Sequence, residues 1–117
     1  EINLNDYQAV VFSGGPKALD YLDNQKVYQI VQQTVQEKKV LGAICISPVI
    51  LAKAGVLKGK QATVWSLVLN RQPVKILKEN GAQYINQSVV KDGLIITANG
   101  PSAATEFGKE VVRVIKR

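Results

Sequence analysis

The chain has 117 residues, of which 46% are hydrophobic and 21% are charged, a composition typical of one globular domain with a modest core. No apolar run approaches the roughly 20 residues that span a bilayer, and no signal-peptide pattern opens the chain, which predicts a cytoplasmic protein without a membrane partner. A single cysteine excludes an internal disulfide, and the absence of histidine argues against a metal site.

The net charge of +6 does not indicate a nucleic-acid partner. The 15 basic residues are scattered, with only Lys58 and Lys60 closely spaced, and no aromatic residues interleave with them. We interpret them as a solvated basic surface.

The first half of the chain predicts a strand, a helix and a second strand. Ala9–Phe12 is an apolar run ended by a Ser-Gly-Gly-Pro turn, which indicates a fully buried strand. Val40–Ile44 shows no polar alternation, as expected of a central parallel strand that helices cover on both faces. Between them, apolar residues at helical spacing predict an amphipathic helix: Val27, Ile30, Val31 and Val35.

The alternation continues after Cys45. Pro48 suits the first turn of a helix and Gly55 its C-terminal cap. Residues 62–65 are a further strand candidate, and residues 74–80 predict a short helix closed by Gly81.

A hairpin and a helix end the pattern. Asp92-Gly93 lies between two apolar runs and favours a tight hairpin turn. A Gly-Pro-Ser sequence then opens an amphipathic helix, whose apolar positions are Phe107, Val111, Val112 and Ile115. Residues 1–117 therefore predict a single α/β domain with a mostly parallel sheet and helices on both faces.

Cys45 is the strongest candidate for chemistry. The sequence from Ala43 to Pro48 fits a nucleophile elbow, a sharp strand-to-helix turn that presents a side chain outward. A helix N-terminus favours the thiolate and lowers its pKa. The N–H of Ile46 is one candidate oxyanion donor, and Gly15, beside Gly14 at the neighbouring strand end, is the second. The alternative is that Cys45 is a small buried hydrophobe.

Other candidate residues have structural explanations. The turn at Gly14-Gly15 lacks the pattern of a phosphate loop. Trp65 either lines a pocket beside the thiol or packs in the core, and core packing is the favoured interpretation. Tyr84 is expected to be a strand aromatic.

Five segments of the chain together resemble the ThiJ/PfpI superfamily, which includes the Parkinson-associated deglycase and the PfpI intracellular peptidases. The most specific part is Ala43-Ile44-Cys45 followed by Ser47-Pro48, after a strand that ends in Ser13-Gly14-Gly15. The supporting segments are residues 56–60, residues 90–97 and Gly100-Pro101.

The resemblance implies a flavodoxin-like three-layer sandwich related to class I glutamine amidotransferases, usually dimeric, with the elbow cysteine as nucleophile or oxidisable thiol. Family members resemble one another in a strand-helix-strand portion before Asp6, which contributes a glutamate bonded to the thiol. That portion has no counterpart here, and the chain lacks methionine, so we expect a fragment of a larger protein.

The absence of histidine separates this chain from the peptidases. The PfpI peptidases resemble one another in a histidine directly after the cysteine, where this chain has Ile46. Peptidase activity therefore becomes the least favoured function, because no Cys-His pair can form.

Two functions of different class remain. In the first, the protein is an enzyme of glyoxalase or deglycase type, in which Cys45 attacks a reactive carbonyl without a cofactor, and Gly14, Ser47 and Trp65 help to bind the substrate. In the second, it is a non-enzymatic redox-sensing or chaperone-like stress protein whose Cys45 is oxidised by a small oxidant. A catalytically inactive structural homologue is a third reading, and a homodimer is expected in each case.

Overall fold

The computed structural model describes residues 9–13, 24–66 and 69–116. Strands and helices alternate along most of the chain, which confirms the α/β prediction. In chain order they are β1 (Ala9–Phe12), α1 (Gln25–Gln36), β2 (Val40–Ile44), α2 (Pro48–Lys53), β3 (Gln61–Ala62), α3 (Gln72–Glu79), β4 (Gln83–Tyr84), β5 (Val89–Asp92), β6 (Ile95–Ala98) and α4 (Ala104–Ile115), the last preceded by a 3-10 turn at Pro101–Ala103.

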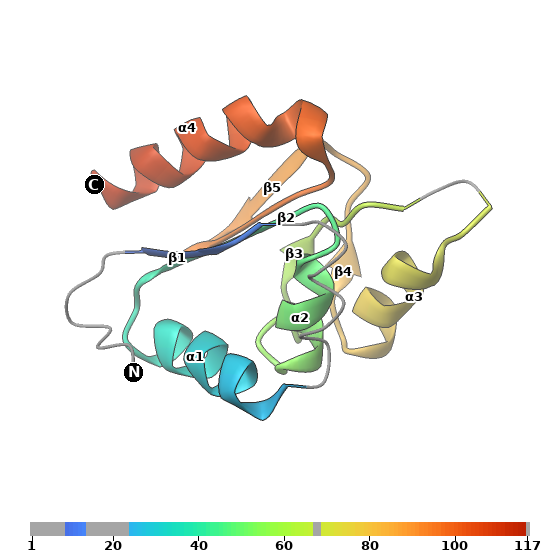
Figure 1. The fold of residues 1–117 in the computed structure, drawn as a ribbon, viewed down its shortest axis with the longest axis horizontal. Helices are drawn as coiled ribbons and strands as arrows, with labels where there is room; N and C mark the ends of the chain where they lie inside the picture. Colours follow the sequence, from blue (N-terminus) through green and yellow to red (C-terminus); the bar gives the residue numbers. More distant parts are fainter. Residues whose placement is uncertain (1–8, 14–23, 67–68, 117) are drawn as a thin grey trace.

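The main sheet has the strand order β1-β2-β6-β5. Its first three strands are parallel, and β5 runs antiparallel to β6. Helix α4 covers one face of the sheet, and α1 and α2 lie on the other (Figure 1). Helix α3 packs against α2 beside a small parallel pair formed by β3 and β4. The three layers confirm the predicted flavodoxin-like sandwich.

Strand β2 is the centre of this arrangement. All five of its residues are buried, and they alternate between two hydrophobic clusters. Leu41 and Ala43 belong to the cluster under α1 and α2, whereas Val40 and Ile44 belong to the cluster under α4. The apolar run without polar alternation is thus a strand with helices on both faces, as predicted.

The turns are formed largely by the residues that the sequence indicated. Gly93 joins β5 to β6 with a φ of 64°, a conformation that only glycine adopts at little cost. Pro48 is the first residue of α2, and Gly55 follows that helix with a φ of 87°. Asn24, which the sequence reasoning overlooked, caps α1 by accepting hydrogen bonds from Lys26 N and Val27 N.

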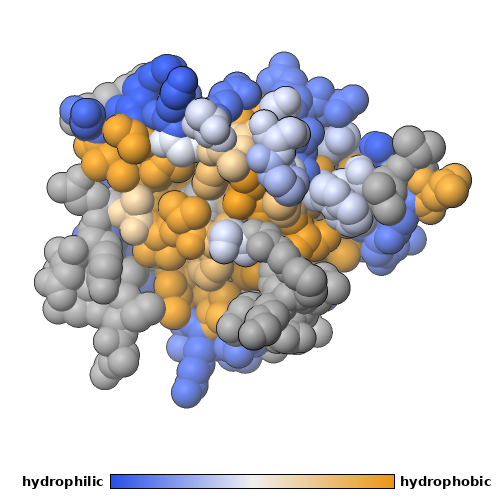
Figure 2. All heavy atoms as spheres, turned by 45° about the horizontal axis from the view of Figure 1, so that its top comes forward, coloured by the Kyte–Doolittle hydropathy of each residue, from blue (hydrophilic) through white to orange (hydrophobic). Residues whose placement is uncertain are grey.

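The prediction that β1 is fully buried is wrong. Val11 is 47% exposed, because among the described strands β1 pairs only with β2 and lies at the edge of the sheet. Val112 of α4 is 49% exposed as well. Figure 2 shows that hydrophobic residues reach the surface across the middle of one face.

The buried stripes of the two long helices also differ from the sequence reading. Helix α1 buries Tyr28, Val31 and Thr34 and leaves Val35 exposed. Thr34 can be buried because its hydroxyl donates to the carbonyl oxygen of Ile30. Helix α4 buries Val114 in addition to Phe107 and Val111, whereas the predicted Val112 faces out.

The strand predicted at residues 62–65 is shorter than expected. Only Gln61–Ala62 forms a strand, although Thr63 and Val64 are also buried. Within the described ranges, no helix is both long enough and apolar enough to cross a bilayer.

Gly42 of β2 lies under α4, and a Cβ atom there would be 2.9 Å from Cζ of Phe107. Phe107 is buried, so the Gly42→Ala variant has to displace the ring from the core. We expect this variant to lose about 1–3 kcal/mol of unfolding free energy, measured by urea denaturation.

Gly108→Ala, in the helix α4 that carries Phe107, is the matched control. A Cβ at Gly108 meets no atom within 4 Å, so this variant should gain about 0.5–1 kcal/mol through reduced backbone entropy of the unfolded chain. Equal urea midpoints for the two variants would contradict this description of the contact between β2 and α4.

Candidate functional site

Cys45 follows directly on the last residue of β2, and α2 begins three residues later. Its φ is 64°, in the left-handed region that side-chain-bearing residues rarely adopt. Holding a residue there costs about 1–3 kcal/mol, so the surrounding structure has to impose it. A strained residue in a sharp strand-to-helix turn is the geometry of a nucleophile elbow.

Two backbone hydrogen bonds hold Cys45 in this conformation. Its N–H donates to the carbonyl oxygen of Ala98, the last residue of β6, over 3.0 Å. Its carbonyl oxygen accepts the N–H of Trp65 over 2.9 Å. The elbow is therefore fixed between the end of β6 and the segment that follows β3.

The turn after Cys45 leaves one backbone donor available. The other N–H groups of the turn donate to carbonyl oxygens: Ser47 to Ile44, Val49 to Ile46, and Ile50 to Ser47. Pro48 has no N–H. The N–H of Ile46 has no acceptor within the described part of the chain. This donor is adjacent to Cys45, where an oxyanion would require it.

Ser47 ties the elbow to the end of β1. Its side chain is fully buried, and its hydroxyl donates to the carbonyl oxygen of Ser13 over 2.9 Å instead of capping α2. The structure thus brings Ser13 to the elbow. Gly14 and Gly15, the other residues predicted for this strand end, lie outside the described residues.

Trp65 is not a core residue, contrary to the favoured interpretation. It is 37% exposed, and its Cδ1 lies 3.8 Å from where a Cβ of Gly100 would be. Because the backbone N–H of Trp65 donates to the carbonyl oxygen of Cys45, the Trp65 side chain lies near the elbow. Tyr84 is a strand aromatic in β4, as expected, with the guanidinium of Arg71 over its ring at 5.7 Å.

The electrostatics of the thiol differ from the sequence expectation. Cys45 is half-buried against the cluster under α4, and this burial raises the pKa of its thiol. The predicted lowering of the pKa is therefore wrong for the described surroundings. The cause is desolvation, because burial disfavours the charged thiolate.

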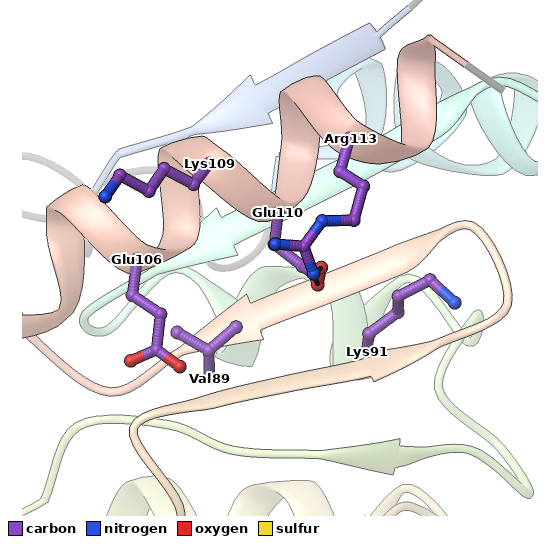
Figure 3. Close-up of a pocket in the computed structure, with 6 residues that line it drawn as sticks. All are labelled: Val89, Lys91, Glu106, Lys109, Glu110 and Arg113. Atoms are coloured by element: carbon purple, nitrogen blue, oxygen red, sulfur yellow. Dashed lines mark hydrogen bonds and ion pairs between the residues drawn. The ribbon is translucent and has the colours of Figure 1, made fainter.

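A separate groove lies between β5 and α4. It has a volume of about 210 Å³, and its charged side chains include an ion pair between Arg113 and Glu110 at 2.9 Å (Figure 3). Cys45 is not among its lining residues, which are Val89, Lys91, Glu106, Lys109, Glu110 and Arg113. In the described part of the chain, acidic residues and the cysteine form no cluster that could hold a metal ion.

Sequence reasoning missed two buried threonines beside the elbow. The Thr97 hydroxyl accepts the N–H of Thr63 over 2.9 Å, whereas the hydroxyl of Thr63 has no partner among the described residues. The available signal was a polar residue inside the apolar run of β6, but its partner is 34 residues away.

Comparison with known proteins agrees with the fold and extends over nearly the whole chain. A protein of Methanocaldococcus jannaschii of uncharacterised function is 42% identical over 118 residues, covering all of this chain and 56% of that protein. A deglycase of Thermococcus kodakarensis is 31% identical, covering 99% of this chain and 67% of that enzyme. The chain thus spans roughly half to two thirds of these relatives.

Among solved structures, the ThiJ/PfpI domain protein of Brachyspira murdochii superposes with a TM-score of 0.92 at 27% identity. The match covers 99% of this chain and 64% of that one. The model of the DJ-1/PfpI family matches residues 1–114. The chain, with its cysteine at the strand-to-helix turn, therefore belongs to the DJ-1/PfpI family.

Proposed function

We propose that this protein acts on reactive carbonyl compounds through Cys45, in the manner of a deglycase or glyoxalase. The observation that carries the proposal is the positive φ of Cys45 at the end of the central strand. Similarity to relatives named as deglycases, in Thermococcus kodakarensis and Pyrococcus furiosus, supports it. The role is protection against carbonyl stress.

The proposed reaction begins with addition of Cys45 Sγ to the aldehyde carbon of an α-oxoaldehyde such as methylglyoxal. A C–S bond forms, and the carbonyl oxygen becomes an alkoxide, which the N–H groups of Ile46 and Gly15 stabilise. Transfer of the C1 proton to C2 gives a thioester. Water then hydrolyses the thioester, releasing lactate and the free thiol.

The proposal assigns substrate binding to Gly14, Ser47 and Trp65. Gly14 lies outside the described residues, and Trp65 offers a partly exposed aromatic side chain. Ser47 is buried, so its contribution is to hold the end of β1 at the elbow.

Proton transfer is the demanding part of the mechanism. Burial raises the pKa of Cys45, and the chain contains no histidine to act as a base. A carboxylate beside Sγ is therefore part of the proposal, in the role that the family resemblance implies for a glutamate. For the same reason, a cysteine peptidase remains the least favoured activity.

A non-enzymatic redox role is the second candidate. Oxidation of Cys45 to sulfenic or sulfinic acid requires a thiolate and an oxidant but no general base during turnover. The N–H of Ile46, which has no acceptor among the described residues and can hold an oxidised sulfur oxygen, favours this candidate. The protein would then serve as an oxidation sensor or chaperone-like stress protein.

We further propose that the protein is a cytoplasmic homodimer that uses no cofactor or metal. Its partners are then a small reactive carbonyl or oxidant and a second copy of the chain, without nucleic acid or membrane.

The first prediction about function concerns catalysis. The wild-type protein should convert methylglyoxal to lactate, whereas the Cys45→Ala variant should fall to the background rate, because it lacks the nucleophile. Lactate is measured enzymatically, and the urea midpoint of each protein checks that both are folded. Equal lactate formation by the two proteins would overturn the enzyme proposal.

The second prediction concerns pH. Because burial raises the pKa of Cys45, the rate of its alkylation by iodoacetamide should rise with pH at a higher midpoint in the folded protein than in urea. The folded state binds the thiol proton of Cys45 more tightly than the unfolded state does. The contribution of this difference to stability is therefore present below the unfolded pKa and is lost as pH rises through the folded pKa. A lower midpoint in the folded protein would show that another group outweighs burial.

The third prediction separates the redox role. Mild peroxide should add one or two oxygen atoms to the wild type, seen in the intact mass, and none to Cys45→Ser at the same dose. The chain has no methionine, so the mass change reports on Cys45 with little interference. If the wild-type mass stays unchanged at doses that modify a low-pKa thiol, the sensor proposal fails.

A further inference from the structure

Thr97 occupies a central place beside the elbow. It is fully buried in β6, directly before Ala98, whose carbonyl oxygen accepts the N–H of Cys45. The Thr97 hydroxyl accepts the N–H of Thr63 over 2.9 Å and lies 3.4 Å from the carbonyl oxygen of Val90, to which it donates. One side chain thus joins β6, β5 and the segment after β3.

The segment after β3 needs this side-chain bond because its backbone ladder ends early. Ala62 is the last residue of β3, and its carbonyl oxygen accepts the N–H of Ile85. Thr63 is buried beyond that point, and its N–H donates to the side-chain hydroxyl of Thr97 in β6 instead of to a strand carbonyl oxygen. Without the hydroxyl, Thr63 would have a buried N–H with no acceptor.

The two ends of this arrangement meet at Cys45. Trp65, two residues after Thr63, donates its N–H to the Cys45 carbonyl oxygen over 2.9 Å. Ala98, one residue after Thr97, holds the Cys45 N–H over 3.0 Å. Both backbone hydrogen bonds of Cys45 therefore depend on Thr97: one through Ala98, which follows it, and one through Thr63, which is bonded to its hydroxyl.

We propose that Thr97 is a positioning residue whose hydroxyl holds residues 63–65 against the elbow, and so keeps the Cys45 backbone in its left-handed conformation and the thiol half-buried. Its importance for function rests on the proposed use of Cys45 as the reactive thiol. Thr97 itself touches no reacting atom.

The Thr97→Val variant tests the proposal, because valine keeps the shape of threonine and replaces the hydroxyl with a methyl group. We expect the released elbow to expose Sγ, so the alkylation midpoint of Cys45 shifts down and its alkylation rate near pH 7 rises about threefold or more. Trp65 is the only tryptophan, and its fluorescence emission should shift to the red as the segment loosens.

Thr63→Val is the matched control. It makes the same chemical change at a neighbouring buried threonine, but the Thr63 hydroxyl has no partner among the described residues. The alkylation profile and tryptophan emission of this variant should therefore match the wild type. Thr97→Ser keeps the hydroxyl and should also retain the wild-type profile, although it removes a buried methyl group.

Several outcomes would overturn the proposal. These are a wild-type alkylation profile in folded Thr97→Val, an equal shift in Thr63→Val, or a shifted profile in folded Thr97→Ser. If Thr97→Val does not fold, the Thr97→Ser variant decides the outcome. The proposal then requires folded Thr97→Ser to keep the wild-type alkylation profile, because only the hydroxyl is retained. Iodoacetamide needs no carbonyl chemistry, so a wild type inactive toward methylglyoxal leaves this test intact.

Discussion

The left-handed backbone of Cys45 is the constraint around which this end of the molecule is built. A φ of 64° is unfavourable for a side-chain-bearing residue, so interactions with its neighbours have to compensate for that cost. Here Ala98 accepts the N–H of Cys45, and Trp65 donates to its carbonyl oxygen. Strand β6 and the segment after β3 must therefore converge on the end of β2. Strand β3 ends at Ala62, which lets the following residues reach the elbow.

Position and reactivity are separate properties at this site. The fold places the thiol at the carboxyl end of the parallel strands, where ligands of α/β proteins bind. The same packing that positions Sγ removes water from it and so stabilises the protonated thiol. The same packing thus fixes the position of the sulfur and favours its protonated form.

Local patterns in the sequence predicted much of the fold. The uninterrupted apolar run of β2, the Asp-Gly hairpin and the helical spacing in α1 each depend on neighbouring residues, and each was recognised. The exposure of Val11 and the pKa direction of Cys45 depend on which elements lie alongside, which one sequence does not encode locally. The bond between Thr63 and Thr97 was missed for the same reason.

Among the described residues, the N–H of Ile46 has no acceptor, whereas every other N–H of the turn at the elbow is bonded or absent. The Ile46 side chain meanwhile packs at the margin of the core. Any residue except proline would supply the same N–H, so position 46 can change its size and polarity without loss of that donor. Substitutions at position 46 can therefore alter access to the sulfur while the backbone donor beside it stays in place.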